Sequence, residues 1–185
     1  WSGKGDRIYF IADIDATDEI FYADVTSNAK KVMNRLTNDN ADYNGLSVTT
    51  VSGTDRLVGT RMSISSPTEV YAIDQKTGQP VWDTKLVNSE KLTVGFTGAP
   101  LLVKDKVIIG VAGGEFGIRG FVSAYEASTG KEAWRLYTVP GPGEPGHETW
   151  QGDAWEHGGG PIWVTGSYDP ELNLTYWGTG NPGPD

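Results

Sequence analysis

Ala72-Ile-Asp-Gln-Lys-Thr-Gly-Gln-Pro-Val-Trp82 occurs again, with the same internal spacing, 52 residues further along as Ala124-Tyr-Glu-Ala-Ser-Thr-Gly-Lys-Glu-Ala-Trp134. In each copy the Thr-Gly pair suits a tight turn between two strands, and the tryptophan supplies a large apolar surface. A repeat of about 50 residues is typical of the blades of a β-propeller. We therefore expect each Thr-Gly pair to join a third strand to a fourth, and Trp82 and Trp134 to pack blade on blade.

Short alternating runs broken by Gly, Asn and Asp turns continue along the whole chain, and no stretch combines helical periodicity with a start signal. The pattern predicts an all-β propeller fragment of about three to four four-stranded antiparallel blades, with almost no helix. The expected strands are 7–14, 19–25 and 32–37 in a first blade that lacks its inner strand; 46–51, 56–62, 68–74 and 80–87 in a second; 99–103, 106–112, 119–126 and 132–138 in a third; and 161–165 and 174–178 in a fourth. A partial ring leaves sheet edges open. We therefore expect either self-association that completes the propeller or a chain that continues.

Two glycine-rich bends each carry one oxygen-bearing side chain. Glu115 lies within Gly113-Gly-Glu-Phe-Gly-Ile-Arg-Gly120, and Asn181 lies within Gly178-Thr-Gly-Asn-Pro-Gly-Pro184. In such bends the backbone can approach a flat ligand or a hard cation closely. Taken singly, each residue also fits a structural turn. The segment 139–160 holds three prolines and seven glycines, and a loop of this length is usually functional.

From residue 75 to residue 185 the chain resembles the pyrroloquinoline quinone (PQQ) dependent alcohol dehydrogenases, which are eight-bladed β-propellers of the periplasm. The resemblance implies PQQ and Ca²⁺ or a lanthanide as cofactors, and a small alcohol as substrate. It implies metal ligation by Glu115 and Asn181, and stacking of Trp163 under the quinone ring. It places four further residues near the quinone carboxylates: Thr97, Ala112, Gly113 and Gly114. At Pro161 some members have Thr, whose hydrogen bond a proline cannot donate.

Residues 1–71 resemble a different group, the TolB-like propeller repeats, which also occur in the propeller domains of prolyl-oligopeptidase-type peptidases. The resemblance rests on Trp1-Ser-Gly-Lys-Gly-Asp-Arg-Ile-Tyr-Phe-Ile-Ala-Asp13, on Asp18-Glu-Ile-Phe-Tyr-Ala-Asp24 and on Tyr43-Asn-Gly-Leu-Ser47. We therefore expect TolB-like blades over 1–71 and PQQ-dehydrogenase-like blades over 72–185, in one continuous propeller domain. The seam would lie between residues 66 and 74. A chimera, made by engineering or recombination, is the interpretation that explains such a seam.

The composition of the chain limits the kinds of partner that it can bind. The 185 residues carry a formal charge of −9 and no cysteine, so disulfides are excluded and no basic patch for nucleic acid is visible. No apolar run approaches the roughly 18 residues of a membrane span. We expect neither nucleic acid nor membrane as a partner.

Three functions remain open. In the resembled family a catalytic aspartate and a quinone-contacting arginine lie beyond residue 185, so no catalytic residue is predicted here. His147 and His157 have no partner at a spacing typical of metal sites or catalytic triads. The first hypothesis is a propeller fragment or chimeric scaffold that carries half of a PQQ and metal site and is not catalytic alone. The second is a PQQ-dependent alcohol dehydrogenase, and the third is a TolB-like propeller that binds a peptide.

Overall fold

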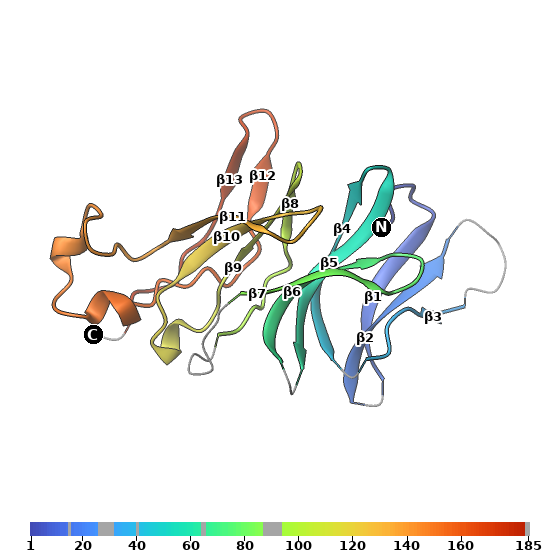
Figure 1. Cartoon of the computed structure of the whole chain (residues 1–185), viewed down its shortest axis with the longest axis horizontal. Helices are drawn as coiled ribbons and strands as arrows, with labels where there is room; N and C mark the ends of the chain where they lie inside the picture. Colours follow the sequence, from blue (N-terminus) through green and yellow to red (C-terminus); the bar gives the residue numbers. More distant parts are fainter. Residues whose placement is uncertain (15, 26–31, 40, 64–65, 87–93, 184–185) are drawn as a thin grey trace.

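The computed structural model describes residues 1–14, 16–25, 32–39, 41–63, 66–86 and 94–183. The strands form four antiparallel sheets; the first three follow one another along the long axis of the molecule, and the fourth stands over the third in the view of Figure 1. The first sheet contains β1 (Arg7–Ile14), β2 (Thr17–Asp24) and β3 (Asn34–Arg35), and the second contains β4 (Asp42–Val51), β5 (Thr54–Ser63), β6 (Ser66–Asp74) and β7 (Pro80–Lys85). The third contains β8 (Leu101–Val103), β9 (Lys106–Gly110), β10 (Phe121–Glu126) and β11 (Glu132–Tyr137), and the fourth is a hairpin of β12 (Ser167–Asp169) and β13 (Leu174–Tyr176).

This architecture confirms the all-β prediction with its four-stranded antiparallel sheets. In the described residues the helical segments are three 3₁₀ turns: η1 (Gly114–Phe116), η2 (His147–Thr149) and η3 (Ala154–His157). None of the described helices is long and apolar enough to cross a membrane. The first sheet has three strands, and its third pairs at only two residues, Asn34 and Arg35. Residue 87, the predicted end of the last strand of the second blade, lies outside the described residues.

The strand predicted over 161–165 is wrong, because the fourth sheet begins at Ser167. Proline has no backbone N–H and cannot donate to a ladder. The Pro161 carbonyl accepts a bond from the Gly180 N–H at 2.7 Å, and the Trp163 carbonyl accepts one from the Thr97 hydroxyl at 2.6 Å. Residues 161–165 are therefore bonded to two loops, in place of the neighbouring strand that the prediction expected.

The repeated motif joins the second and third sheets. Thr77-Gly78 connects β6 to β7, and Thr129-Gly130 connects β10 to β11, as predicted. Trp82 on β7 is 9% exposed, and its indole N–H donates to the Ala127 carbonyl at 3.0 Å. A Cβ on Gly130 would lie 2.5 Å from the Trp82 ring. Trp82 thus packs onto the β10–β11 turn, whereas Trp134 in the second copy is 42% exposed.

Two apolar cores lie between successive sheets. One joins residues such as Ile20 to Leu57 and Tyr71, and the other joins Val58 and Val70 to Val107 and their neighbours. The predicted division at residues 71 and 72 falls inside β6, which pairs with β5 on one side and β7 on the other. The two predicted parts therefore share one sheet. The TolB-like origin of residues 1–71 stays a prediction.

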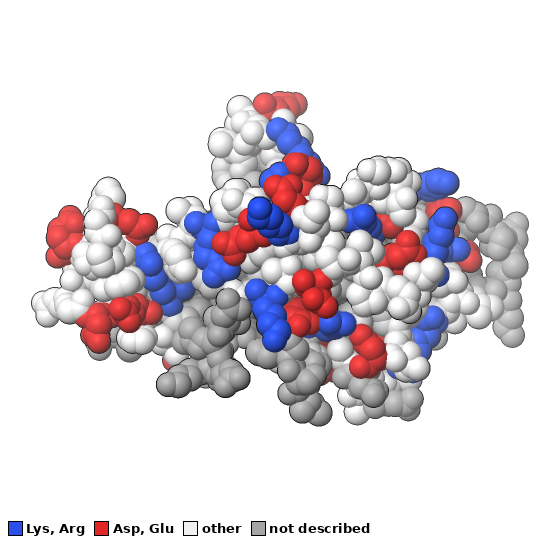
Figure 2. Space-filling view, viewed as in Figure 1, with Lys and Arg blue, Asp and Glu red and all other residues white. Residues whose placement is uncertain are grey.

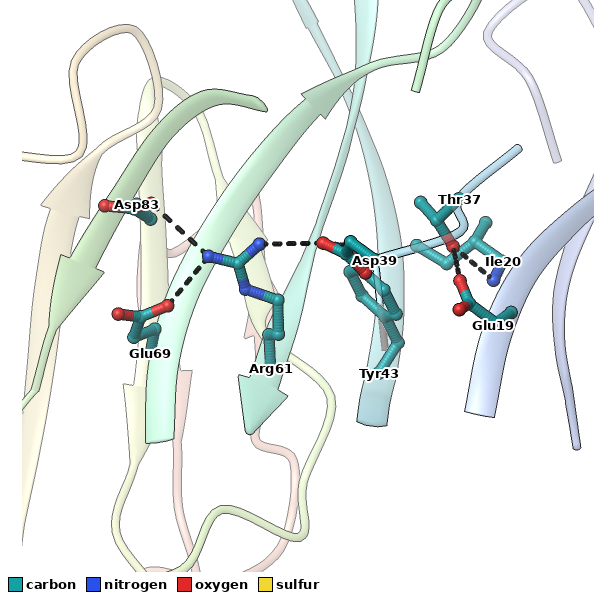
Figure 3. A network of polar contacts seen from close by, with 8 residues as sticks. All are labelled: Glu19, Ile20, Thr37, Asp39, Tyr43, Arg61, Glu69 and Asp83. Atoms are coloured by element: carbon teal, nitrogen blue, oxygen red, sulfur yellow. Dashed lines mark hydrogen bonds and ion pairs between the residues drawn. The ribbon is translucent and has the colours of Figure 1, made fainter. Parts of the chain in front are cut away.

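Charged side chains add two polar clusters at the second and first sheets (Figure 3). Arg61 on β5 contacts Glu69 at 2.9 Å, Asp39 at 3.1 Å and Asp83 at 3.4 Å. Burial alone would lower the pKa of Arg61, but its bond to Glu69 and its contact with Tyr43 outweigh this and raise the pKa. Over the face in Figure 2, acidic and basic residues are interspersed without a large patch of one sign.

Candidate functional site

A cavity of about 410 Å³ brings together most of the residues that the sequence singled out. Its wall includes five of the seven predicted site residues: Thr97, Ala112, Gly113, Glu115 and Trp163. Five further residues, which the sequence did not single out as ligands, complete the described wall: Met62, Val94, Gly95, Phe116 and Pro161. Residues from four separate segments of the chain therefore meet at one cavity.

The loop that carries Thr97 is fixed from two sides. Gly95 and Ala112 exchange backbone hydrogen bonds of 3.3 and 2.8 Å, which place the loop beside the end of β9. The Thr97 hydroxyl donates to the Trp163 carbonyl at 2.6 Å, and the Thr165 hydroxyl donates to the Ala99 carbonyl at 3.0 Å. These two reciprocal bonds join the loop to the segment of Trp163.

Strand β4 supports the same loop from the other side. The Asn44 amide donates to the Phe96 carbonyl at 3.4 Å, and the Ser47 hydroxyl donates to the Pro100 carbonyl at 2.7 Å. Gly45 forms a bulge between them, and a Cβ there would stand 2.7 Å from the Cα of Ala99. Bulges of this kind re-aim a strand next to functional sites. The segment predicted as TolB-like thus shapes the cavity.

Glu115 lies in η1, a single 3₁₀ turn bounded by two glycines with left-handed backbone. Gly113 has φ 109° and Gly117 has φ 69°, conformations that L side chains rarely adopt. The turn exposes Glu115, whose carboxylate has no hydrogen bond or ion pair with the residues that the structure describes. Gly114 does not line the cavity, because it packs against the ring of Pro161 instead.

Asn181 also lies outside the cavity wall. Its side-chain amide donates to the Pro182 carbonyl at 2.9 Å, and its own carbonyl accepts the Gly160 N–H at 2.9 Å. The glycine before Asn181 and the glycine before Glu115 both contact Pro161. The structure therefore brings the two turns together across one proline, while joint ligation of a cation by Glu115 and Asn181 stays a prediction.

No group of three or more His, Cys, Asp or Glu side chains is close enough to hold a metal ion in the described residues. A cation here would take part of its coordination from amides, hydroxyls, backbone carbonyls or a bound ligand, all of which suit a hard cation. The donors that Glu115, Asn181 and their turns offer are one carboxylate, one side-chain amide and the carbonyls of the glycine-rich turns.

A second cavity of about 370 Å³ lies beside the first and shares Met62, Gly95 and Thr97 with it. Its remaining wall comes mostly from β4 and β5, including Asn44 and Arg61. Sequence reasoning missed Met62 and this side of the site. Nothing in the local pattern of β5 separates a residue at the cavity from any other exposed strand residue.

The predicted excursion over 139–160 is organised by Arg119. Its guanidinium donates to the Val139 carbonyl and to Glu144, both at 2.8 Å, and lies 4.0 Å from the centre of the Tyr137 ring. The ring nitrogen Nδ1 of His157 lies 3.0 Å from the Gly117 carbonyl. This contact ties the excursion to the turn of Glu115.

Comparison with known proteins identifies the family of the chain. Residues 84–185 match the PQQ family model, which describes the glucose/ethanol/alcohol dehydrogenase β-propeller domain. That match covers more than half of the chain. The chain belongs to this family.

Among curated members, quinohemoprotein alcohol dehydrogenase ADH IIB of Pseudomonas putida is 52% identical over 126 residues, which cover 62% of this chain and 18% of that protein. The lanthanide-dependent methanol dehydrogenase of Methylacidiphilum fumariolicum (strain SolV) is 42% identical over 134 residues, covering 62% and 22%. The chain therefore spans about a fifth of the length of these relatives.

The structural likeness extends further along the chain. A europium-containing methanol dehydrogenase superposes with a TM-score of 0.73 at 31% identity and covers 97% of this chain and 34% of that one. The propeller prediction is thus confirmed by its structural neighbours, and the likeness includes the N-terminal sheets that lie before the matched family model.

Proposed function

We propose that this chain forms part of the PQQ and cation site of a periplasmic PQQ-dependent alcohol dehydrogenase. The observation that carries the proposal is the single cavity at which Thr97, Gly113, Glu115 and Trp163 meet. These residues come from three separate parts of the sequence, and chance would not place this predicted set around one opening.

The residues present fit a planar, anionic quinone. The cavity volume of about 410 Å³ falls within the range of about 300–1,000 Å³ that is usual for cofactor sites. Trp163 is 53% exposed and offers an apolar surface to a flat ring. Glu115 offers an oxygen ligand for a cation, and Thr97 and the backbone at Gly113 lie at the same opening.

When bound, PQQ supplies the oxidant that accepts electrons from an alcohol, and the cation polarises it. In this proposal Trp163 covers one face of the ring and excludes water from it. Glu115 and Asn181 hold the cation, while Gly113 and Gly114 let the backbone come close to the ligand. By the family resemblance, the catalytic aspartate lies outside these residues, so we propose that the chain is not catalytic alone.

The proposals about the origin and the assembly of the chain differ in how well they are supported. The structural likeness over 97% of the chain supports one quinoprotein propeller throughout. A chimeric or engineered origin, a TolB-like interaction function and self-association into a fuller ring stay predictions. Self-association can be checked by sedimentation of the 185-residue chain over a range of concentrations.

Titration of the chain with PQQ in the presence of Ca²⁺ or La³⁺ tests the proposal, with tryptophan fluorescence and quinone absorbance as readouts. We expect saturable quenching that Trp163→Leu abolishes. Because Glu115 is proposed to bind the cation directly, Glu115→Gln should raise the cation concentration needed for half-maximal quenching at least as much as loss of an outer-shell partner does, which is about 10–100-fold. Trp134→Leu is the matched control, since Trp134 is also half exposed but lies outside the cavity wall. Equal quenching in the Trp163 and Trp134 variants, or none in a folded parent chain, would refute the proposal.

A further inference from the structure

Pro161 lies between the two turns that carry the proposed cation ligands. A Cβ on Gly114 would stand 2.7 Å from Cδ and 2.8 Å from Cγ of Pro161. A Cβ on Gly180 would stand 2.8 Å from Cγ and 3.0 Å from Cδ of the same ring. Real Cβ atoms essentially never approach other heavy atoms within 3.0 Å, so both turns touch the proline ring as closely as glycine permits.

Each contact involves the residue that directly precedes a proposed ligand. Gly114 precedes Glu115 in η1, and Gly180 precedes Asn181. Pro161 itself is buried. The two turns therefore share one buried contact, the ring of Pro161, whose φ is fixed.

Backbone bonds hold both turns against that ring. On one side, the Gly180 N–H donates to the Pro161 carbonyl at 2.7 Å, and the Gly160 N–H donates to the Asn181 carbonyl at 2.9 Å. The Gly183 N–H extends this pairing to the Gly158 carbonyl at 3.0 Å. The pattern uses the carbonyl of Pro161 and needs no N–H from it, so proline is compatible with the pairing.

On the other side, η1 is closed by its own hydrogen bonds. The Phe116 N–H donates to the Gly113 carbonyl at 3.0 Å, and the Gly117 N–H donates to the Gly114 carbonyl at 3.3 Å. The Gly159 N–H also donates to the Ile118 carbonyl at 2.9 Å, which ties the segment before Pro161 to the chain after η1. The bonds within η1 keep the turn intact, and the bond from Gly159 to Ile118 limits how far it can move from Pro161.

We propose that Pro161 is a positioning residue whose ring fixes the separation of the Glu115 and Asn181 turns, so that one cation can be held between them. The inference rests on the proposed function for its purpose, but the positioning itself is a property of the fold. A smaller side chain at residue 161 would leave the two turns without their common contact and allow a wider range of separations.

The positioning is tested first without any metal. The chain has no cysteine, so spin labels on Glu115→Cys and Asn181→Cys report a single distance by electron paramagnetic resonance. Pro161→Ala should broaden the distance distribution, whereas Pro170→Ala, at an exposed proline in the β12–β13 turn, should leave it unchanged. An identical distribution in the Pro161 variant and its parent overturns the inference, whatever the chain binds.

The consequence for a cation is tested with Tb³⁺, whose emission can be sensitised by a nearby tryptophan such as Trp163. We expect Pro161→Ala to raise the Kd for Tb³⁺ about 10–100-fold, as outer-shell changes do. Gly180→Ala should also raise it, because its methyl group would collide with the ring, and the double variant Pro161→Ala/Gly180→Ala should recover part of the loss.

The outcomes separate the two proposals. If Glu115→Gln leaves Tb³⁺ binding unchanged, the proposed cation site is wrong even when the labels confirm the positioning. If Glu115→Gln weakens binding but Pro161→Ala does not, the cation site stands and the role of Pro161 is wrong.

Discussion

Replacing Gly130 with alanine should destabilise the contact between the second and third sheets. Gly130 has φ 73°, where alanine costs about 1–2 kcal/mol. Its new methyl group would stand 2.5 Å from Cε3 and 2.7 Å from Cδ2 of Trp82, and overpacking of this kind costs about 1–3 kcal/mol. We therefore expect the free energy of unfolding to fall by about 2–5 kcal/mol, measured from the urea midpoint.

Gly53→Ala separates the backbone cost from the collision. Gly53 has φ 78° in the β4–β5 turn, and a Cβ there would meet nothing within 4 Å. The free energy of unfolding of this control should fall only by the backbone cost of about 1–2 kcal/mol. In a Trp82→Leu background the ring is gone and the Thr84 hydroxyl, 2.9 Å from the added methyl group, is the close neighbour that remains, so the cost of Gly130→Ala should fall toward that of Gly53→Ala.

The interaction energy between Gly130→Ala and Trp82→Leu decides whether Trp82 docks the second sheet on the third. Contacting residues show interaction energies of about 0.5–3 kcal/mol in double-mutant cycles. If Gly130→Ala costs the same with and without the Trp82 ring, the tryptophan does not dock the second sheet on the third, and our reading of the repeated motif is wrong.

Two further variants test individual polar contacts. Arg35→Met removes the guanidinium that lies 3.0 Å from Glu19, whose side chain is fully buried. Breaking a buried pair costs about 3–5 kcal/mol, and we expect the lower end of that range because the Arg35 side chain is 31% exposed. Adding Glu19→Gln should recover most of the lost free energy of unfolding. For Asp74, burial would raise the pKa, but the N–H groups of Thr77 and Lys76 outweigh it and lower the pKa from 3.8. The contribution of the Asp74 carboxylate to the free energy of unfolding is therefore present above pH 3.8 and is lost as the pH falls through the lower pKa of the folded state. Asp74→Asn should therefore lower the free energy of unfolding, measured by chemical denaturation, by less below about pH 4 than above it. A loss of free energy that does not depend on pH would contradict this.

The parts of the fold that could be predicted are those that local sequence specifies. Thr77-Gly78 and Thr129-Gly130 turn where expected, because glycine accepts the positive φ of 69° and 73° that these turns need. Trp82 docks as its spacing in the repeat suggested. The strand predicted over 161–165 failed because Ile162 and Trp163 read as part of an extended run, while the partners of that run are loops distant in the sequence.

The candidate site shows the same limit. The family resemblance supplied the identities of Thr97, Glu115 and Trp163, and the structure then placed them around one cavity. Met62 and Gly95 reach that cavity only through the packing of β5 and of the loop before β8. No local pattern specifies such a contact, because it depends on how one sheet lies against the next.

The close fit between β4 and the Thr97 loop bears on the origin of the N-terminal segment. Gly45 has room for no side chain against Ala99, and Asn44 and Ser47 both bond to carbonyls of that loop. A strand taken from an unrelated propeller would have to reproduce a bulge, a glycine and two donors at matching positions. The loop it supports holds Thr97 against the carbonyl of Trp163. Whatever the origin of the segment, the contacts of β4 place residues before 71 among those that support the loop of the proposed quinone site.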